Sequence, residues 1–221
     1  MRYVATMAEG NPRRRSTPDR TNARAIALLE AAEAILAESG AEALNARAVA
    51  ERAGVAKGLV FYYWGSTREL FREVLERYYE RHKAALADSF AVEGTLGERI
   101  RNVVDTYLTF MEANRGYARI VQQQIAGRGS ELPLVSQHLA EVLGIARETL
   151  AGVLPDSGPL SARHFQLSLS ALVINYFTYA PLLTEEPWPD GDALSAAALA
   201  ERRDHVRWVV DAWLAALAND R

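Results

Sequence analysis

The segment from Ala48 to Phe71 constrains the fold of this chain more than any other. It holds two short stretches of helical pattern, 48–53 and 57–64, separated by the corner Gly54-Val55-Ala56. Glycine takes positive φ without steric cost, so the first short helix can end at Gly54 while Val55 packs the corner. A further helical stretch begins directly after Gly65-Ser66. This order predicts a helix-turn-helix.

The second short helix carries three aromatic residues in succession, Phe61, Tyr62 and Tyr63. A soluble protein has little reason to show such a surface to water, and the major groove of DNA would explain the exposure. A protein-binding aromatic cluster is the alternative. Val60 and Trp64 are four residues apart and therefore share one face of their helix. We predict that this face packs with Val49 and Val55 to form the small core of the module. The remaining side chains are predicted to point outward or to the flanks: Lys57, Leu59, Phe61, Tyr62 and Tyr63.

The composition favours an all-α fold with a substantial core. The chain has 221 residues, 49% of them hydrophobic, and is rich in Ala, Leu, Glu and Arg, which favour helices. Cysteine is absent from the sequence, so it holds no disulfide and no thiolate metal site. The first twenty residues lack the apolar region of a secretory signal, and no run reaches the roughly 18 apolar residues of a membrane span. We therefore expect a cytoplasmic protein without a membrane partner.

The net charge of −3 conceals an asymmetry. Residues 1–70 contain ten Lys and Arg against eight Asp and Glu, whereas residues 71–221 contain 15 against 20. Phosphate contacts need cations only where they touch DNA, so a basic reading module on an acidic body is consistent with DNA binding. The run Arg13-Arg14-Arg15 predicts a flexible basic arm over 1–20 that enters the minor groove or follows phosphates. The alternative for this arm is a solvated leader.

Breaks in helical periodicity predict about nine helices. We expect Gly40 to close the first helix in the left-handed conformation, Asn45 to cap the second, and Ser66 with Glu69 to form a capping box at the fourth. The expected helices span 21–39, from 45 to the glycine corner, 57–64, from 66 or 67 to 89, 96–113, 117–127, 132–153, 161–182 and 194–218.

The first three of these helices and the start of the fourth resemble a known family residue by residue. The matching stretches are Leu36-Ala37-Glu38-Ser39-Gly40, Val49 through Gly58, and Tyr62-Tyr63-Trp64-Gly65-Ser66-Thr67-Arg68-Glu69-Leu70. About 50 residues resemble the N-terminal domain of the tetracycline-repressor (TetR) family of bacterial regulators. The resemblance implies a helix-turn-helix DNA-binding domain over 21–68 and a larger ligand-binding and dimerisation domain over 69–221.

The resemblance also implies which residues contact DNA. It places DNA contacts at 57, 58, 59, 61 and 63, with Arg47 and position 67 on the DNA backbone. This sequence departs from the common pattern at Ala56, Leu59, Phe61 and Thr67, so it has fewer polar side chains for DNA contacts there. We expect binding to depend more on Arg47, Arg68 and the N-terminal arginines. The predicted DNA-binding residues are Asn45, Arg47, Lys57, Gly58, Leu59, Phe61, Tyr62, Tyr63 and Thr67.

The two C-terminal helices are predicted to form the dimer. The helix over 161–182 is apolar nearly all round, so it must be covered on two sides. The last helix is also rich in apolar residues, and the pair can form a symmetric four-helix interface, as the resemblance implies. Burial within one chain is the alternative.

By the same resemblance, a pocket for a small-molecule effector lies among the fourth to eighth helices. Asn175 is the preferred contact, because a buried amide needs a partner that a ligand could supply. His138 and His164 could sense charge or bind metal, but with only four widely spaced histidines we expect no metal site, and we expect no cofactor. The candidate effector contacts are Tyr107, Phe110, Met111, Gln124, His138, Asn175, Tyr176 and Tyr179.

Taken together, these features predict a DNA-binding transcriptional regulator. The expected protein is a repressor that binds a palindromic operator as a homodimer and is released by a small molecule. An architectural DNA-binding protein of the same fold without an effector is the first alternative. A helical enzyme is the second and is not expected, because no phosphate-binding glycine loop, nucleophile elbow or cysteine is present in the sequence.

Overall fold

The computed structural model describes residues 18–151 and 154–219, so most of the predicted arm over 1–20 lies outside the described residues. The described part is helical, with no strand. The prediction of an all-α protein with about nine helices is confirmed for this part of the chain. Its helices are α1 (Ala23–Ser39), α2 (Ala46–Ala53), α3 (Gly58–Trp64), α4 (Thr67–Phe90), α5 (Leu96–Ala113), α6 (Arg115–Ala126), α7 (Leu132–Thr149), α8 (Ala162–Tyr179) and α9 (Ala196–Asn219), with short 3-10 helices at Ala41–Ala43, Ala180–Leu182 and Pro189–Gly191.

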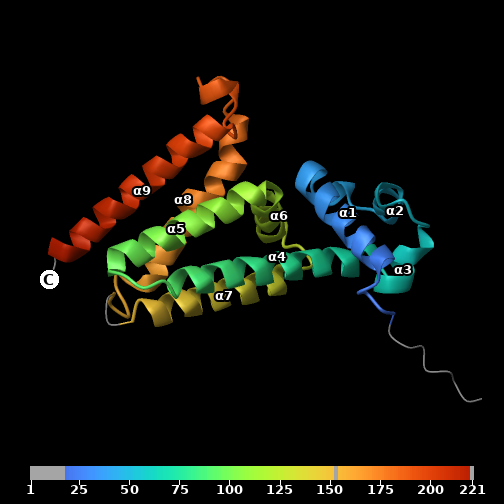
Figure 1. The fold of residues 1–221 in the computed structure, drawn as a ribbon, viewed down its shortest axis with the longest axis horizontal. Helices are drawn as coiled ribbons and strands as arrows, with labels where there is room; N and C mark the ends of the chain where they lie inside the picture. The colour runs from blue at the N-terminus through green and yellow to red at the C-terminus, as the bar shows by residue number, and fades with distance from the viewer. Residues whose placement is uncertain (1–17, 152–153, 220–221) are drawn as a thin grey trace, which may run out of the picture.

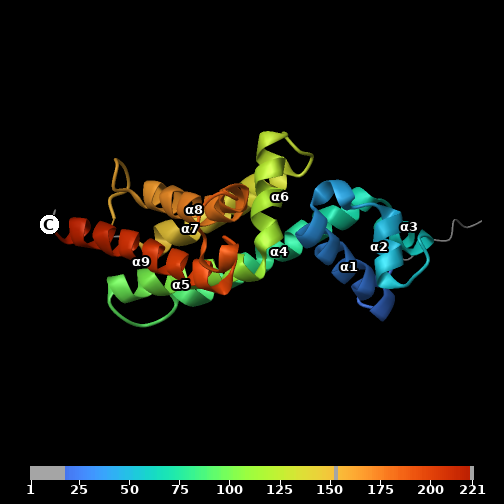
Figure 2. The ribbon, with the colours of Figure 1, turned by 90° about the horizontal axis from the view of Figure 1, so that it is seen from above.

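The helices form a small lobe and a larger body. Helices α1, α2 and α3 make the lobe, and the long α4 runs from it along the body beside α5 and α7 (Figure 1). Helix α6 stands across the junction and packs against α1 (Figure 2). Helix α9 packs on α5 and ends at the side of the body farthest from the lobe. Helix α4 therefore links the lobe mechanically to the body core.

Local signals explain several of the helix boundaries. The Asn45 side chain accepts hydrogen bonds from the first backbone N–H groups of α2, as predicted. Gly54 ends α2 in the left-handed conformation, with φ 66° and ψ 31°. The prediction for Gly40 was wrong in detail: its φ is 79°, but its ψ of 179° lies outside the left-handed helical region. A positive φ still requires glycine there.

Other helix ends also differ from the prediction, since α1 begins at Ala23 instead of 21 and α6 spans Arg115–Ala126 instead of 117–127. The Ser66 hydroxyl accepts from the Glu69 amide at 3.1 Å, but the complete capping box is the one at Thr95 and Glu98, before α5. Helix α7 ends at Thr149 instead of 153. Helix α8 ends at Tyr179, where the chain tightens into a 3-10 turn that contains Pro181, a residue without a backbone N–H.

One hydrophobic core extends from the lobe into the body. In the lobe, Val49, Val60 and Trp64 are buried together with α1, which confirms their predicted structural role. The body core is formed by the facing sides of α4 to α9, and α9 is held to α5 by ion pairs such as Arg207 with Asp105. No helix within the described residues is long and apolar enough to cross a membrane.

Candidate functional site

The outer face of α3 is the candidate nucleic-acid interface. Phe61 and Tyr62 are among the most exposed large hydrophobic side chains of the lobe, at 47% and 61%. Lys57, at the start of α3, is also exposed and makes no ion pair with any described residue. Gly58 has open space where a side chain would be. These four residues leave the beginning and the outer face of α3 free for a partner.

Tyr63 does not share that exposure, so the prediction that it points outward was wrong. Its side chain is 7% exposed, its hydroxyl donates to Asn22 Oδ1 at 3.1 Å, and its ring packs edge-on against Tyr62. Its backbone carbonyl accepts from Arg20 Nε at 2.9 Å. In a helix, successive residues differ by about 100°, so neighbouring aromatic residues cannot all face outward. Tyr63 instead ties α3 to the start of α1.

The other predicted DNA-binding residues flank α3. Leu59 and Thr67 are half-buried. The side-chain oxygen of Asn45 already accepts hydrogen bonds from the first backbone amides of α2. Arg47 is exposed and, among the described residues, pairs only with Glu51, one turn later, at 2.7 Å. Such an exposed pair contributes little energy and can be exchanged for a phosphate. Arg68 is already engaged, because its Nε donates to Glu131 of α7 at 3.0 Å.

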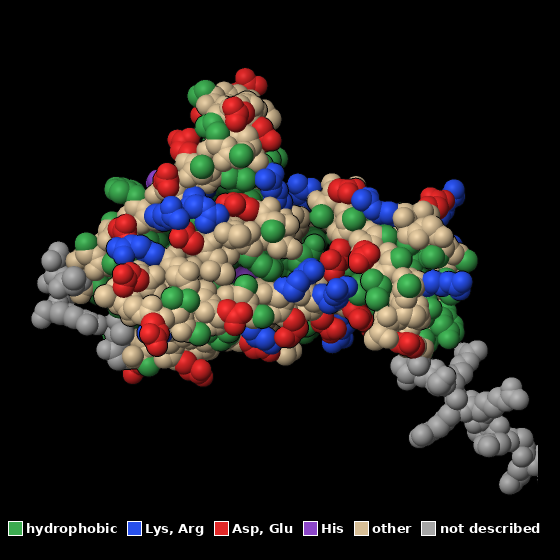
Figure 3. All heavy atoms as spheres, viewed as in Figure 1, with side chains coloured by type: hydrophobic (Ala, Val, Ile, Leu, Met, Phe, Trp, Pro, Cys, Tyr) green, Lys and Arg blue, Asp and Glu red, His purple; other side chains and the backbone are tan. Residues whose placement is uncertain are grey.

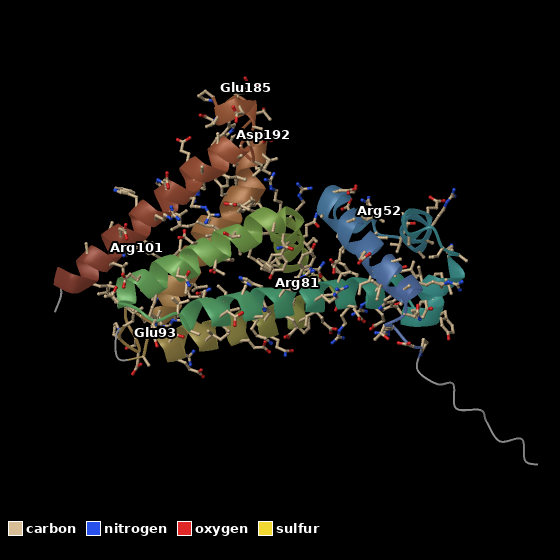
Figure 4. All side chains as sticks on the ribbon, in the orientation of Figure 1. Arg52, Arg81, Glu93, Arg101, Glu185 and Asp192 are labelled. Atoms are coloured by element: carbon tan, nitrogen blue, oxygen red, sulfur yellow. The ribbon has the colours of Figure 1, made fainter. Side chains whose placement is uncertain are left out.

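On the face of the lobe that Figure 3 shows, side chains of Lys and Arg lie among those of Asp and Glu. Residues 18–70 hold six Lys and Arg against seven Asp and Glu, so the basic excess of residues 1–70 depends on arginines that precede the described residues. Arg52, labelled in Figure 4, donates to both oxygens of Glu38 at 2.6 Å. That bond lowers the pKa of Glu38 below its usual value. Lys57, which makes no ion pair with a described residue, directly precedes α3 and its exposed aromatic residues.

A second polar centre lies inside the body, where α4 faces α7. Nδ1 of His82 on α4 lies 3.0 Å from Nε2 of His138 on α7, and both residues are 4% exposed. The Tyr79 ring stacks on His138 at 4.3 Å between centroids. Tyr107 and Phe110 of α5 stack on His82 at 4.9 and 4.8 Å. We call these five residues together with Tyr117 of α6 the histidine-aromatic cluster.

Burial keeps both histidines neutral. Desolvation, with a smaller contribution from His138, lowers the pKa of His82 to about 3. Desolvation also lowers the pKa of His138 to about 4, against the opposing effect of Glu141. Burial raises the pKa of the Tyr79, Tyr107 and Tyr117 hydroxyls, so these phenols are neutral as well. The cluster is therefore an uncharged interior that still carries hydrogen-bonding groups.

The structure brings together only some of the predicted effector contacts. Tyr107, Phe110 and His138 belong to the histidine-aromatic cluster, and Met111 is fully buried in the core. Gln124 lies in the last turn of α6, where its side-chain oxygen accepts from the Glu131 amide at 3.3 Å. Tyr179 is 58% exposed at the end of α8.

Asn175 does not lack a partner, which was the reason for preferring it. Its Oδ1 accepts from Gln122 Nε2 at 3.1 Å, and this bond joins α8 to α6. Tyr176, the next residue, donates to the Ala193 carbonyl at 2.7 Å and lines a separate surface pocket of about 290 Å³ with Trp188 and Arg202. Within the described residues, no group of three or more His, Asp or Glu side chains is arranged to hold a metal ion.

His82 is the main residue that sequence reasoning missed. It follows Leu75, Tyr78 and Tyr79 at the i, i+3 and i+4 spacing of one buried helix face, and this periodicity was the available signal. Its partner, His138, is 56 residues away along the chain. Only the packing of α4 against α7 brings the two rings together.

Most of the lobe and the first part of α4 match the model of a known protein family. Residues 28–74 match the model described as bacterial regulatory proteins, tetR family. The helix-turn-helix-type transcriptional regulator YfiR of Bacillus subtilis (strain 168) is 28% identical over 100 residues, which cover 41% of this chain and 49% of that protein. The match thus spans about half of that relative's length.

Solved structures share the whole fold at low identity. The ketosteroid transcriptional regulator KstR2 of Mycobacterium tuberculosis has a TM-score of 0.64 and 17% identity, covering 89% of this chain and 98% of that chain. The transcriptional regulator FadR of Bacillus subtilis, in complex with stearoyl-CoA, has a TM-score of 0.63 and 15% identity, covering 84% and 96%. These similarities establish the arrangement of the lobe and body.

Proposed function

We propose that this chain, a member of the TetR family of bacterial regulatory proteins, is a transcriptional repressor that binds a near-palindromic operator as a homodimer and is released by a small molecule. The observation that carries the proposal is the exposed outer face of α3, which follows a glycine corner in a lobe matched by the family model. In a helix-turn-helix, this second helix enters the major groove.

The chemistry of the α3 face suits DNA. Lys57 can reach phosphate or guanine, and Gly58 lets the backbone come close to the DNA. The Tyr62 hydroxyl can donate to a phosphate, and the apolar Phe61 can contact a thymine methyl group. Arg47, held only by a surface ion pair, can grip the flanking backbone. Tyr63 supports this face from below through its bond to Asn22.

The proposed dimer uses the outer faces of α8 and α9. Leu167 of α8 is 60% exposed and Trp208 of α9 is 67% exposed, so both of these large apolar side chains face solvent in the single protomer. A two-fold axis through these helices would pair each apolar face with its own copy. Two reading helices would then meet successive major grooves about 34–36 Å apart.

The proposed release mechanism depends on α4. This helix begins at the lobe and carries Tyr79 and His82 of the histidine-aromatic cluster, so a change in the body core can move the lobe. A ligand achieves this only if its affinity differs between two positions of α4. KstR2 is a ketosteroid transcriptional regulator and the FadR structure is a complex with stearoyl-CoA. A largely apolar effector is consistent with the aromatic lining of the histidine-aromatic cluster in this chain.

The function is tested by selecting binding sites from random double-stranded DNA with the full chain. We expect enrichment of one near-palindrome whose half-sites lie about one helical turn apart. A selected pool without any common motif would contradict the proposal. A motif whose binding no small molecule can weaken would indicate the architectural protein instead.

A further inference from the structure

Three buried polar atoms of the histidine-aromatic cluster lack a hydrogen-bond partner among the described residues. They are the Tyr79 hydroxyl oxygen, His82 Nε2 and His138 Nδ1, on side chains that are each 4% exposed. Leaving a buried polar group unsatisfied is costly, and native proteins rarely do so three times in one place. The cluster is therefore built to receive a polar group from outside the chain.

The bond between the two imidazoles determines what that group can be. Each neutral ring carries one proton, and one of the two protons lies in the bond between His82 Nδ1 and His138 Nε2. If His82 donates, its Nε2 is a free acceptor and His138 Nδ1 is a free donor. If His138 donates, the two free ends exchange these roles. In either state the pair offers one donor and one acceptor. A hydroxyl group can bond to either end, and a carbonyl group can accept from the donor end.

The surroundings favour an uncharged ligand. The charged groups facing His138 are Glu80 and Lys83 of α4 and Glu141 of α7, and Lys83 is paired with both carboxylates. No cation in the described chain is thus left over to neutralise a buried anion at this point. On the inner side, the rings of Tyr107, Phe110 and Tyr117 provide flat apolar walls.

A hollow of about 50 Å³ between α4 and α7 reaches the cluster from the surface. Its lining includes Tyr79 and His138, with Glu76, Glu80 and Glu141 among the other residues. This volume admits a hydroxyl group or a water molecule, but not an aromatic ring. A ring could enter only if α4 moved away from α7, and α4 leads to the DNA-binding lobe.

We infer that the His82–His138 pair, with Tyr79, is the polar recognition point of the effector site, and that it takes an uncharged molecule with a flat apolar body and one hydroxyl or carbonyl group. This inference rests on the proposed function. It assigns the ligand's polar group to the interface of α4 and α7, so that the same binding event separates these helices.

The test uses four probes that share one ring system: naphthalene, 2-naphthol, 2-naphthoate and 2-(aminomethyl)naphthalene. The full chain is titrated with each at pH 7 while the imidazole nitrogens are followed by ¹⁵N NMR. We expect 2-naphthol to bind at least tenfold more tightly than the other three and to shift the signals of His82 and His138. Binding of 2-naphthoate should strengthen as the pH falls, because the carboxylate must take up a proton.

Variants separate recognition from packing. His82→Phe and His138→Phe retain an aromatic ring and remove the nitrogens, so the advantage of 2-naphthol over naphthalene should disappear. His205→Phe, at an exposed position on α9, should retain it. The NMR titration of the unaltered chain remains decisive if a variant does not fold.

Equal affinity for 2-naphthol and naphthalene would overturn the inference, and so would tighter binding of either charged probe at pH 7. Absence of binding by all four probes at millimolar concentration would also overturn it and would leave the hollow a water site only. None of them affects the DNA selection experiment. A chain that selects a palindrome but binds no probe would refute this inference and leave the proposed function intact, whereas failure of the selection would refute the function itself.

Discussion

Nε of Arg68 lies 3.0 Å from Oε1 of Glu131, and this contact joins the lobe end of α4 to the start of α7. The two partners differ sharply in environment, because the Arg68 side chain is 64% exposed and that of Glu131 only 4%. Ser130 also donates to the same oxygen at 2.8 Å. The buried carboxylate therefore depends on an exposed cation from the helix that carries the lobe.

Arg68→Ala should destabilise the fold by removing that cation. Breaking a buried ion pair costs about 3–5 kcal/mol, but exposure of Arg68 reduces the expected loss to about 1–2 kcal/mol. Arg72→Ala is the matched control, because Arg72 pairs on the surface with Glu76 and should cost about 0.5 kcal/mol or less. Urea unfolding measures both losses. Equal losses would show that Glu131 does not depend on Arg68.

Gly116→Ala should force α6 away from α1. A Cβ at Gly116 would lie 2.5 Å from Cα of Ala37, which is backbone and cannot swing aside. We expect a loss of about 1–3 kcal/mol in the free energy of unfolding. Gly144→Ala in α7 meets no atom within 4 Å and should stabilise the helix by up to about 1 kcal/mol. Thermal denaturation of the two variants should therefore shift in opposite directions, and a stabilised Gly116→Ala would contradict the packing of α1 on α6.

Stability should fall in mildly acidic solution because of the histidine pair. In the unfolded chain, histidine takes up a proton near pH 6.5, whereas burial lowers the pKa of His82 to about 3 and that of His138 to about 4. The stabilisation is therefore complete above about pH 6.5 and is lost as the pH falls towards the folded values, by about 1.4 kcal/mol per pH unit for each histidine.

Between pH 6.5 and 4.5 the loss of stability caused by the histidines can be separated from the loss caused by the paired carboxylates, because carboxylates take up protons at lower pH. Melting temperatures across this window should fall steeply for the unaltered chain and much less for the double variant His82→Phe and His138→Phe. The exposed His164 and His205 supply controls, since His164→Phe and His205→Phe should keep the steep dependence. A flat profile for the unaltered chain would show that the pair is not neutral and buried.

A charge on the outer face of α8 or α9 should break the proposed dimer. Leu167→Glu and Trp208→Glu would each place a carboxylate where two apolar faces meet, so sedimentation at micromolar concentration should show monomers. Val92→Glu, between α4 and α5, alters another exposed apolar residue outside this face and should leave a dimer. A monomeric unaltered chain would reject the interface.

The lobe was predictable because its signals are local. Gly54, Asn45 and the apolar positions Val49, Val60 and Trp64 act within a few residues of the backbone they shape, and the structure places them as the pattern requires. The orientation of Tyr63 was not predictable in this way. It depends on Asn22, which lies 41 residues earlier and meets the hydroxyl only after α1 has packed on α3.

The interior was predicted less well for the same reason. Asn175 seemed to need a ligand because its partner, Gln122, lies on another helix and 53 residues away. His138 was a candidate, but its chemistry depends on His82. Periodicity can place a polar residue on a buried face, but which polar groups meet across helices is set by tertiary packing.

Binding of the selected operator by variants of α3 is the most direct test of the central claim that its exposed face reads DNA. Tyr62→Ala and Lys57→Ala should each weaken binding about tenfold, as expected for loss of one base or phosphate contact of 1–3 kcal/mol, while the melting temperature stays unchanged because both side chains are exposed. Ile125→Ala, an exposed position on α6, should bind like the unaltered chain. Unchanged operator affinity in both α3 variants would contradict the account.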